Sequence, residues 1–203
     1  MKGDLFVISA PSGAGKSTLC NGLMGANPNI KFSVSYTTRQ PRPGEVNGIH
    51  YNFVAEAEFQ KMADNGEFLE WARVHNNYYG TSRKAIEDML SSGADCLLDI
   101  DTQGASQIRQ KFPDAVLLFI LPPSMEALRE RLEGRKSDSP EVIKTRLENA
   151  RGEIKRYKDF DYVIINDSLE EALERLKAVL LARKCLMAKI DPGWIEKSFL
   201  GRG

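Results

Sequence analysis

The chain has few cysteines and histidines. Its 203 residues include only three cysteines, Cys20, Cys96 and Cys185, which lie far apart and form no CxxC pair. This spacing argues against a disulfide framework or a zinc site, and it fits a reducing compartment. The two histidines, His50 and His75, form no metal-binding pair, and we expect both in loops or on the surface.

An excess of charge of one sign is also missing. Lys and Arg together number 28, Asp and Glu together number 28, and the formal net charge is zero. This balance argues against duplex nucleic acid or an anionic membrane as a partner. No run reaches ~18 apolar residues, so no transmembrane helix is predicted. The N-terminal residues have no apolar stretch of signal-peptide shape, and we expect a cytoplasmic protein.

Short apolar segments alternate with helical patterns along most of the chain. Buried strands are predicted at residues 5–8, 96–101, 116–121 and 162–165. Helical patterns are present at residues 16–24, 83–91, 105–111, 125–133 and 140–157. A capping box at residues 168–171 opens the last helix, whereas residues after Lys189 have no clear period and are expected as a loosely held tail. The alternation predicts an α/β fold with a mostly parallel sheet covered on both faces.

Residues 33–82 break this alternation. The stretch combines a β-prone segment at 33–38, a loop at 39–44, a strand candidate at 51–54 and a short helix at 57–65. It is rich in aromatic, hydroxyl and charged side chains, which is typical of an inserted subdomain with mixed strands. Residues 135–139 are all polar, and they predict the tip of a second, smaller excursion.

A glycine-rich loop follows the first predicted strand and opens a helix. Residues 10–17 match the phosphate-loop pattern GxxxxGK[ST], except that Ala10 replaces the first glycine. Gly13 and Gly15 allow the backbone N–H groups to turn inward toward phosphate oxygens, and the helix N-terminus adds partial positive charge. Lys16 is placed to reach the β- and γ-phosphates, and the Ser17 hydroxyl to ligate Mg²⁺. These residues predict a protein that uses ATP or GTP.

Two carboxylates stand at the end of a predicted strand. In a doubly wound sheet, ligands bind at the carboxyl ends of the strands, so Asp99 is a candidate metal-binding carboxylate. The alternative is that one of them caps the next helix, and for Asp101 alone this alternative is a good one.

Several further segments resemble guanylate kinases, in order and with family spacing from about residue 4 to residue 184. They are residues 33–45, 47–54, 67–72, 77–81 and 98–104. The resemblance implies a P-loop NTPase fold with a mostly parallel five-stranded sheet, flanking helices, a mixed α/β GMP-binding insert and a short lid. It also implies transfer of the γ-phosphate from ATP to GMP, with Mg²⁺ as the cofactor of ATP, in purine nucleotide metabolism.

The resemblance also assigns roles to individual residues. The GMP phosphate would be held by Arg39, Arg42, Tyr51 and Tyr79, and guanine would be recognised by Ser35, Glu70, Thr81 and Asp101. Charge stabilisation during transfer is expected from Lys16, Arg131, Arg135 and Arg146. ATP would be bound by Ala10, Pro11, Ser12, Gly13, Ala14, Gly15, Lys16, Ser17, Thr18 and Asn166, the last near the adenine ring. The metal ligands would be Ser17 and Asp99.

Residues 1–203 are thus expected to form one guanylate-kinase-like domain. Its core would comprise residues 4–32, 83–124 and 147–184, with the insert at 33–82, the lid at 125–146 and a tail at 185–203.

Two alternatives to a guanylate kinase are a scaffold that binds phosphopeptides and another P-loop kinase or GTPase. The first would have lost the phosphate loop, and a GTPase would show an Asn-Lys-x-Asp motif where residues 166–168 read Asn-Asp-Ser. The sequence leaves oligomeric state and dGMP tolerance open.

Overall fold

The core of the fold is a five-stranded sheet. The computed structural model describes residues 2–74, 76–134 and 139–201. Its main sheet has the order β2-β7-β1-β8-β9, and all neighbouring strands run parallel. These strands are β1 (Leu5–Ser9), β2 (Ile30–Phe32), β7 (Asp95–Asp99), β8 (Val116–Leu121) and β9 (Tyr162–Ile165). The prediction of an α/β fold with a mostly parallel five-stranded sheet is therefore confirmed.

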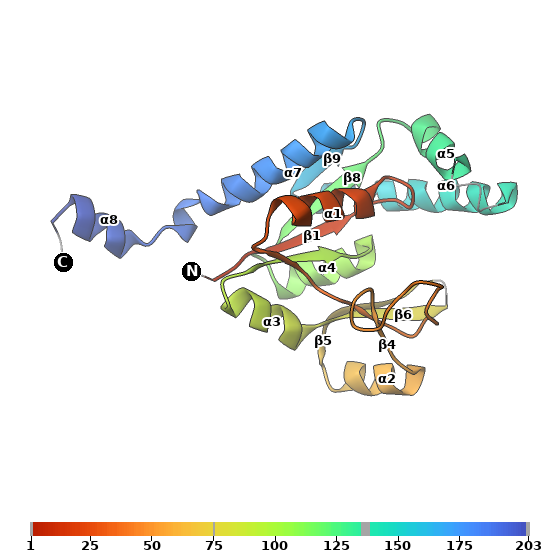
Figure 1. Cartoon of the computed structure of the whole chain (residues 1–203), viewed down its shortest axis with the longest axis horizontal. Coiled ribbons are helices and arrows are strands. Elements are labelled where there is room, and N and C mark those ends of the chain that lie inside the picture. Colours follow the sequence, from red (N-terminus) through yellow and green to blue (C-terminus); the bar gives the residue numbers. More distant parts are fainter. Residues whose placement is uncertain (1, 75, 135–138, 202–203) are drawn as a thin grey trace.

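Successive strand residues point to opposite faces of this sheet, and helices pack against both faces. On one face, Phe6 and Ile8 of β1 belong to the same core as α1 (Lys16–Ala26) and α7 (Leu169–Lys184). On the other face, Leu5 and Val7 belong to the core formed with α3 (Arg83–Ser91) and α4 (Thr102–Lys111). Figure 1 shows these layers, with α1 and α7 on one side of β1 and α3 and α4 on the other.

The predicted insert forms a second, smaller sheet. It consists of β3 (Tyr36–Thr37), β4 (Asn52–Phe53), β5 (Phe68–Val74) and β6 (Asn77–Ser82), in the order β4-β3-β6-β5. The pair β3 and β4 is parallel, whereas β6 pairs antiparallel with both β3 and β5. Helix α2 (Glu56–Asp64) packs on it through the fully buried ring of Phe59, which stacks on Phe68 at 4.5 Å between ring centroids.

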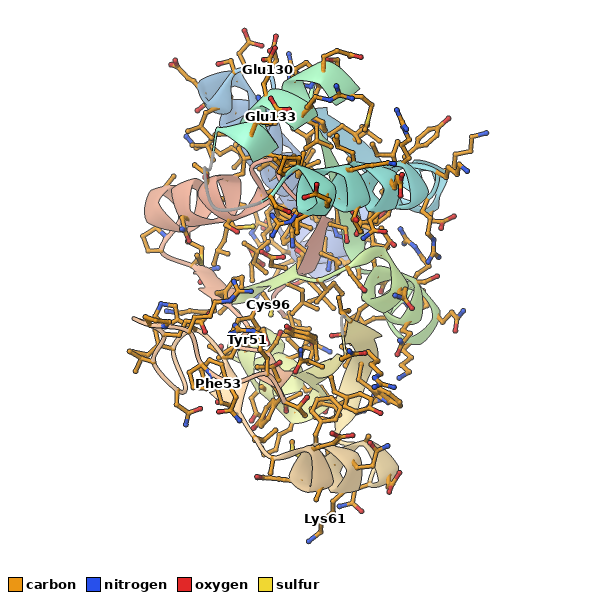
Figure 2. The ribbon with its side chains drawn as sticks, turned by 90° about the vertical axis from the view of Figure 1, so that its right-hand side faces the viewer. Tyr51, Phe53, Lys61, Cys96, Glu130 and Glu133 are labelled. Carbon is orange, nitrogen blue, oxygen red and sulfur yellow. The ribbon has the colours of Figure 1, made fainter. Side chains whose placement is uncertain are left out.

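A helical hairpin follows the fourth strand of the main sheet. Helix α5 (Met125–Glu133) packs against α6 (Pro140–Ile154) through a small core of Leu128, Leu132, Leu147 and Ala150. In Figure 2, Glu130 and Glu133 of α5 lie at one end of the molecule and Lys61 of α2 at the other, with Cys96 of the main sheet between them. The insert and the hairpin thus lie on opposite sides of the main sheet.

Four strands and helices were not predicted individually: β2, β5, β6 and α8 (Pro192–Phe199). Strand β2 has only three residues, too short for a recognisable alternation, so no strand was predicted in the residues just before the insert. Helix α8 lies in the tail and begins with Asp191 accepting a hydrogen bond from Gly193 N at 2.9 Å. Figure 1 shows α8 beyond the end of α7, away from the sheets. The tail expected after Lys189 therefore contains a helix, which its lack of a clear period did not indicate.

The remaining short elements are two 3-10 helices, at Tyr157–Asp159 and Met187–Lys189. The single helix predicted over residues 140–157 ends at Ile154, and the first 3-10 helix begins at Tyr157. Within residues 2–74, 76–134 and 139–201, none of the helices has the length and apolar character that crossing a bilayer requires.

Candidate functional site

The loop between β1 and α1 has the conformation that a phosphate loop needs. Gly13 and Gly15 have φ values of 96° and 93°, in the region that favours glycine, and α1 begins at Lys16 directly after them. Ala10 is not among the described residues with positive φ, so alanine fits the first bend without strain. The predicted order of strand, glycine turn and helix N-terminus is therefore present.

The residue after β9 and helix α5 contact the phosphate loop and support it. The Asn166 side-chain amide donates to the carbonyl of Ala14 at 2.7 Å, and Arg131 donates to the carbonyl of Asn166 at 2.8 Å. A Cβ on Gly13 would lie 2.9 Å from Leu132 Cδ2 of α5, so helix and loop are in close contact. Asn166 thus orients the loop, and its expected position near the adenine ring stays a prediction.

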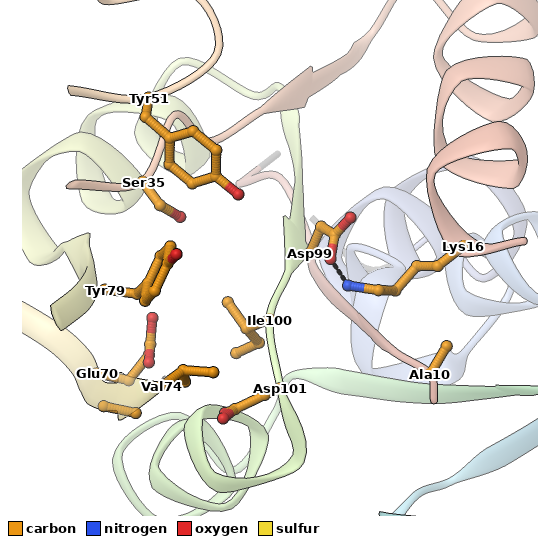
Figure 3. Close-up of a pocket in the computed structure, with 11 residues that line it drawn as sticks. Ala10, Lys16, Ser35, Tyr51, Glu70, Val74, Tyr79, Asp99, Ile100 and Asp101 are labelled. Atoms are coloured by element: carbon orange, nitrogen blue, oxygen red, sulfur yellow. Dashed lines mark ion pairs between the residues drawn. The ribbon is translucent and has the colours of Figure 1, made fainter. Parts of the chain in front are cut away.

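Lys16 forms an ion pair with Asp99 at the end of β7, which Figure 3 marks with a dashed line. Burial lowers the pKa of the Lys16 ammonium to about 8, although the charges of Asp101 and Glu153 act in the opposite direction. The end of β1 is also tied to the residue after Asp99, because Ser9 Oγ donates to the carbonyl of Ile100 at 2.5 Å. The loop and the carboxyl end of β7 therefore form one unit.

Asp101 caps a helix and also faces the cavity, and its role in recognising guanine stays a prediction. Its Oδ1 accepts a hydrogen bond from Gly104 N at 2.8 Å, so it is the N-cap of α4. It also lines a cavity next to the phosphate loop. The predicted strand at residues 96–101 ends at Asp99, because Asp101 already belongs to the start of this helix.

This cavity joins the phosphate loop to the insert (Figure 3). Eight of its lining residues were predicted as site residues: Ala10, Lys16, Ser35, Tyr51, Glu70, Tyr79, Asp99 and Asp101. The other three are Ala72, Val74 and Ile100, which apolar sequence patterns do not distinguish from core residues. Figure 3 shows Tyr51, Ser35, Tyr79 and Glu70 facing the Lys16–Asp99 pair across the cavity.

Glu70 is a buried carboxylate in this cavity. It is 4% exposed, and burial raises its pKa to about 7, with the charge of Asp101 acting in the same direction. The opposing effect comes from Thr81, whose Oγ1 donates to Glu70 Oε1 at 2.5 Å. The single hydroxyl proton of Thr81 is thus directed at Glu70 in this structure, and the expected contact of Thr81 with guanine stays a prediction.

Arg39 is held in place by Glu45. Its two terminal nitrogens lie 2.8 and 3.0 Å from the two carboxylate oxygens, and its guanidinium lies 5.4 Å from the centre of the Tyr51 ring. The Arg39 bonds and the backbone N–H of Arg42 hold the pKa of Glu45 at about 2. The Tyr51 and Tyr79 rings meet edge to face at 5.9 Å. Arg39 and the two tyrosines therefore form one cluster around an anionic group.

Other predicted site residues lie outside the lining of the cavity. The side chains of Arg42, Ser12, Ser17 and Thr18 are exposed, and Pro11 is buried. Arg146 lies half-buried on α6, Arg131 is half-buried on α5, and Arg135 lies outside the described residues. A metal would have to use few protein ligands, since the described residues contain no cluster of three or more His, Cys, Asp or Glu side chains that could hold one.

Sequence reasoning assigned no role to Glu45 or Glu153. Glu153 of α6 accepts a hydrogen bond from the backbone N–H of Ser12, and its Oε2 is buried without a hydrogen-bond partner. It is one of several charged residues on a mainly polar helix, so its sequence context gave no signal. For Glu45, the only signal was its place six residues after Arg39 in a loop.

The parallel sheet, the glycine turn, the lysine at the helix N-terminus and the aspartate on the adjacent strand define a P-loop NTPase fold. The family model for guanylate kinase matches residues 2–183. A guanylate kinase of Dechloromonas aromatica is 56% identical over 182 residues, covering 90% of both chains. Another, of Geobacter sulfurreducens, is 51% identical over 189 residues, covering 93% of both.

Solved structures agree with these relatives. The crystal structure of guanylate kinase from Anaplasma phagocytophilum is similar with a TM-score of 0.82 and 36% identity, covering 100% of this chain and 97% of that one. The chain belongs to the guanylate kinase family and is a nucleoside-monophosphate kinase.

Proposed function

We propose that this protein transfers the γ-phosphate of ATP to GMP, giving ADP and GDP in purine nucleotide metabolism. The observation that carries the proposal is the shared cavity, in which Lys16 and Asp99 of the donor side face Glu70, Ser35 and the tyrosines of the insert. A phosphate donor on the loop and a purine monophosphate against the insert would meet in this cavity.

The choice of guanine rests on Glu70. Guanine presents N1–H and its exocyclic amine side by side, and one carboxylate can accept both hydrogen bonds. Adenine has an unprotonated N1 there and no 2-amine, so it would leave the buried carboxylate without donors. A site built for such hydrogen bonds can reject an analogue that lacks them by ~10⁴. Ser35 and Asp101 line the same cavity and supply further polar contacts to the base.

The GMP phosphate would bind at the cluster of Arg39, Tyr51 and Tyr79, with Arg42 on the same loop. A guanidinium fork suits a doubly charged phosphate, and in this structure the fork of Arg39 already holds the Glu45 carboxylate in that geometry. Phosphate binding would therefore compete with Glu45 for Arg39.

Catalysis would consist of positioning and charge stabilisation. A GMP phosphate oxygen is already anionic, so in-line attack on the γ-phosphorus requires no strong general base. Lys16 would bind the β- and γ-phosphates after leaving Asp99, while Arg131, Arg146 and Arg135 of the hairpin would neutralise developing charge. Residues 10–18 would bind the donor, mainly through backbone N–H groups, which all of them except Pro11 have, and closure of the lid would exclude water.

Ser17 and Asp99 fit Mg²⁺. Both offer hard oxygen ligands, and Mg²⁺ prefers one or two such protein ligands together with water and substrate phosphate. When bound, the ion would neutralise charge on the phosphates. The absence of a larger acidic cluster among the described residues agrees with this sparse coordination.

We also propose the division of the chain given above, with a core, an insert at residues 33–82, a lid at 125–146 and a tail at 185–203. The separate sheet of the insert and the separate small core of the hairpin support it. The free cysteines Cys20 and Cys96 are buried, which supports a reducing, cytoplasmic location.

The test is ATP turnover with a panel of monophosphates. We expect GMP to support ADP formation, while AMP, CMP and UMP at equal concentration give at least ~100-fold less. Lys16→Met should reduce GMP-dependent turnover at least ~100-fold, because it removes a charge that acts on the transferred phosphate. Lys84→Met, at an exposed lysine of α3, is the matched control. Near-normal turnover by Lys16→Met with an intact fold would contradict the proposal, as would equal use of AMP.

A further inference from the structure

Gly104 lies in the first turn of α4, next to two carboxylates that line the cavity, Asp101 at the start of the same helix and Glu70 of the insert. Its N–H donates to Asp101 Oδ1 at 2.8 Å. A Cβ built on Gly104 would lie 2.6 Å from Glu70 Oε2 and 3.2 Å from Glu70 Cδ. The Glu70 carboxylate therefore rests directly against the hydrogen face of this glycine.

Backbone conformation does not explain this glycine. Gly104 is not among the described glycines with positive φ, and it lies inside a helix, where alanine is favoured by about 1 kcal/mol. Gly152, inside α6, gives a contrast, because a Cβ there would meet no atom within 4 Å. What Gly104 provides is space for a close approach.

The approach is fixed from both sides. Three hydrogen bonds clamp α4 to β5: Gln107 Nε2 to the Trp71 carbonyl at 2.7 Å, Trp71 N to Gln107 Oε1 at 3.2 Å, and Lys111 Nζ to the Leu69 carbonyl at 2.7 Å. Strand β5 is in turn paired with β6 from Glu70 to Val74 without interruption, after an irregularity between Phe68 and Glu70. Moving the helix away from the strand would break these three hydrogen bonds. An added methyl group would therefore displace the end of the Glu70 side chain instead.

Such a displacement would act on recognition and not on folding. The Glu70 carboxylate is already fixed at Oε1 by Thr81, so the two oxygens are held by a hydrogen bond on one side and by the glycine on the other. Moving Oε2 would misalign the carboxylate with the N1–H and the 2-amine of guanine. Two parallel hydrogen bonds of this kind tolerate only small shifts in position.

We propose that Gly104 is a positioning residue for base selection, because its missing side chain sets where the Glu70 carboxylate stands. The inference rests on the proposed function. Gly104 touches no substrate and acts through Glu70 alone.

The test is Gly104→Ala, with Gly152→Ala as the matched control. We expect Gly104→Ala to raise the KM for GMP roughly 10- to 100-fold, the range for a lost charged hydrogen bond. The KM for ATP should stay within about twofold, because the phosphate loop is unchanged. The preference for GMP over IMP, which lacks the 2-amine, should fall by a similar factor. Gly152→Ala should change none of these values.

A double-mutant cycle with Glu70→Ala tests the mechanism. When Glu70 is truncated, the remaining close contact of the new methyl group is Ile100 Cδ1 at 3.2 Å, the flexible end of a side chain that can shift by a few tenths of an ångström. Adding Gly104→Ala should then change the KM for GMP by less than about twofold. If Gly104→Ala alone does not fold, recovery of folding in the double mutant supports the proposal, and failure of both overturns it. An unchanged KM and GMP-to-IMP preference in Gly104→Ala, or a full effect in the Glu70→Ala background, would also overturn it. A wild-type enzyme inert toward GMP would instead overturn the proposed function.

Discussion

At the scale of single residues, Glu70 connects burial with recognition. Its pKa is raised to about 7, first by burial and then by Asp101, although the Thr81 hydroxyl opposes the shift. Near neutral pH, the free protein therefore has both the protonated and the ionised form. Only the ionised form can accept both donors of guanine, so binding of GMP must be linked to loss of this proton.

We predict that the KM for GMP rises as pH falls below about 7, by up to tenfold per pH unit, and levels off above it. Below this pH, binding must first remove a proton from Glu70, and each unit costs about 1.4 kcal/mol. Steady-state kinetics between about pH 5.5 and pH 8.5 would measure the slope.

Glu70→Gln supplies the control, because it cannot ionise. In this variant only the phosphate of GMP titrates, with a second pKa of about 6 as in other phosphate monoesters. The slope should therefore be smaller and displaced to lower pH. Identical pH profiles for the two proteins would show that Glu70 does not titrate on binding.

At the scale of elements, the phosphate loop depends on the conformation of one residue. Gly15 combines a φ of 93° with close packing, because a Cβ would lie 2.3 Å from Asn166 Nδ2. That nitrogen also holds the Ala14 carbonyl at 2.7 Å. A side chain at Gly15 would thus strain the backbone and detach the loop from its support.

We predict that Gly15→Ala destabilises the fold by about 1–2 kcal/mol and raises the KM for ATP at least tenfold. Gly25→Ala in α1, the helix that follows Gly15, is the control, because a Cβ there has no atom within 4 Å and its φ is not positive. It should leave the KM unchanged and stabilise by up to about 0.5 kcal/mol. Urea unfolding and initial rates would give both quantities, and equal behaviour of the two variants would contradict the argument.

Local signals predicted the helices well. Ser82, Ser124, Ser139 and Ser168 each accept a hydrogen bond from the first turn of a helix, and all four helices had been expected from their patterns. The short strands β2, β3 and β4 have two or three residues each, so hydrogen bonding to distant partners defines them and their own pattern does not. Their sheet positions could not be predicted from the sequence.

At the scale of the whole molecule, the amino end of the main sheet ties the two ends of the chain together. Asp4, before β1, is 3% exposed and accepts from Arg183 at 3.0 Å, Lys184 at 2.9 Å and Lys189 at 2.6 Å. Lys184 also lies 2.5 Å from Asp95 at the start of β7. This cluster lies at the opposite end of β1 from the phosphate loop.

We predict that the cluster contributes stability that acid removes. Burial alone would raise the pKa of Asp4, but hydrogen bonds from Lys189, Lys184 and Arg183 lower it below the ordinary value of 3.8. Its contribution is therefore present above about pH 4 and is lost as pH falls through the lower folded value. Asp4→Asn should cost about 1–2 kcal/mol near pH 7, because the neutral amide loses charge-assisted hydrogen bonds from three cations that stay partly exposed.

Urea unfolding of both proteins from about pH 7 to about pH 2 measures this difference, which should shrink toward the acid end. The KM values for ATP and GMP should not change, since the cluster is remote from the cavity. A constant difference across this pH range would show that Asp4 contributes by packing and not by its charge.

The sequence by itself determined the features that depend only on residues close together in the chain. The phosphate loop is a continuous segment, its conformation follows from Gly13 and Gly15, and helix caps act over three residues. The family resemblance then indicated which residues of the insert would contact the acceptor.

Only the tertiary structure decided how distant groups meet. It paired Arg39 with Glu45, turned the Thr81 hydroxyl toward Glu70, and brought Gly104 against the same carboxylate. It also joined Asp4 to Arg183 across 179 positions of the chain. Hydrogen bonds and close contacts between such residues depend on side-chain positions to within a few tenths of an ångström, and packing of whole elements fixes those positions.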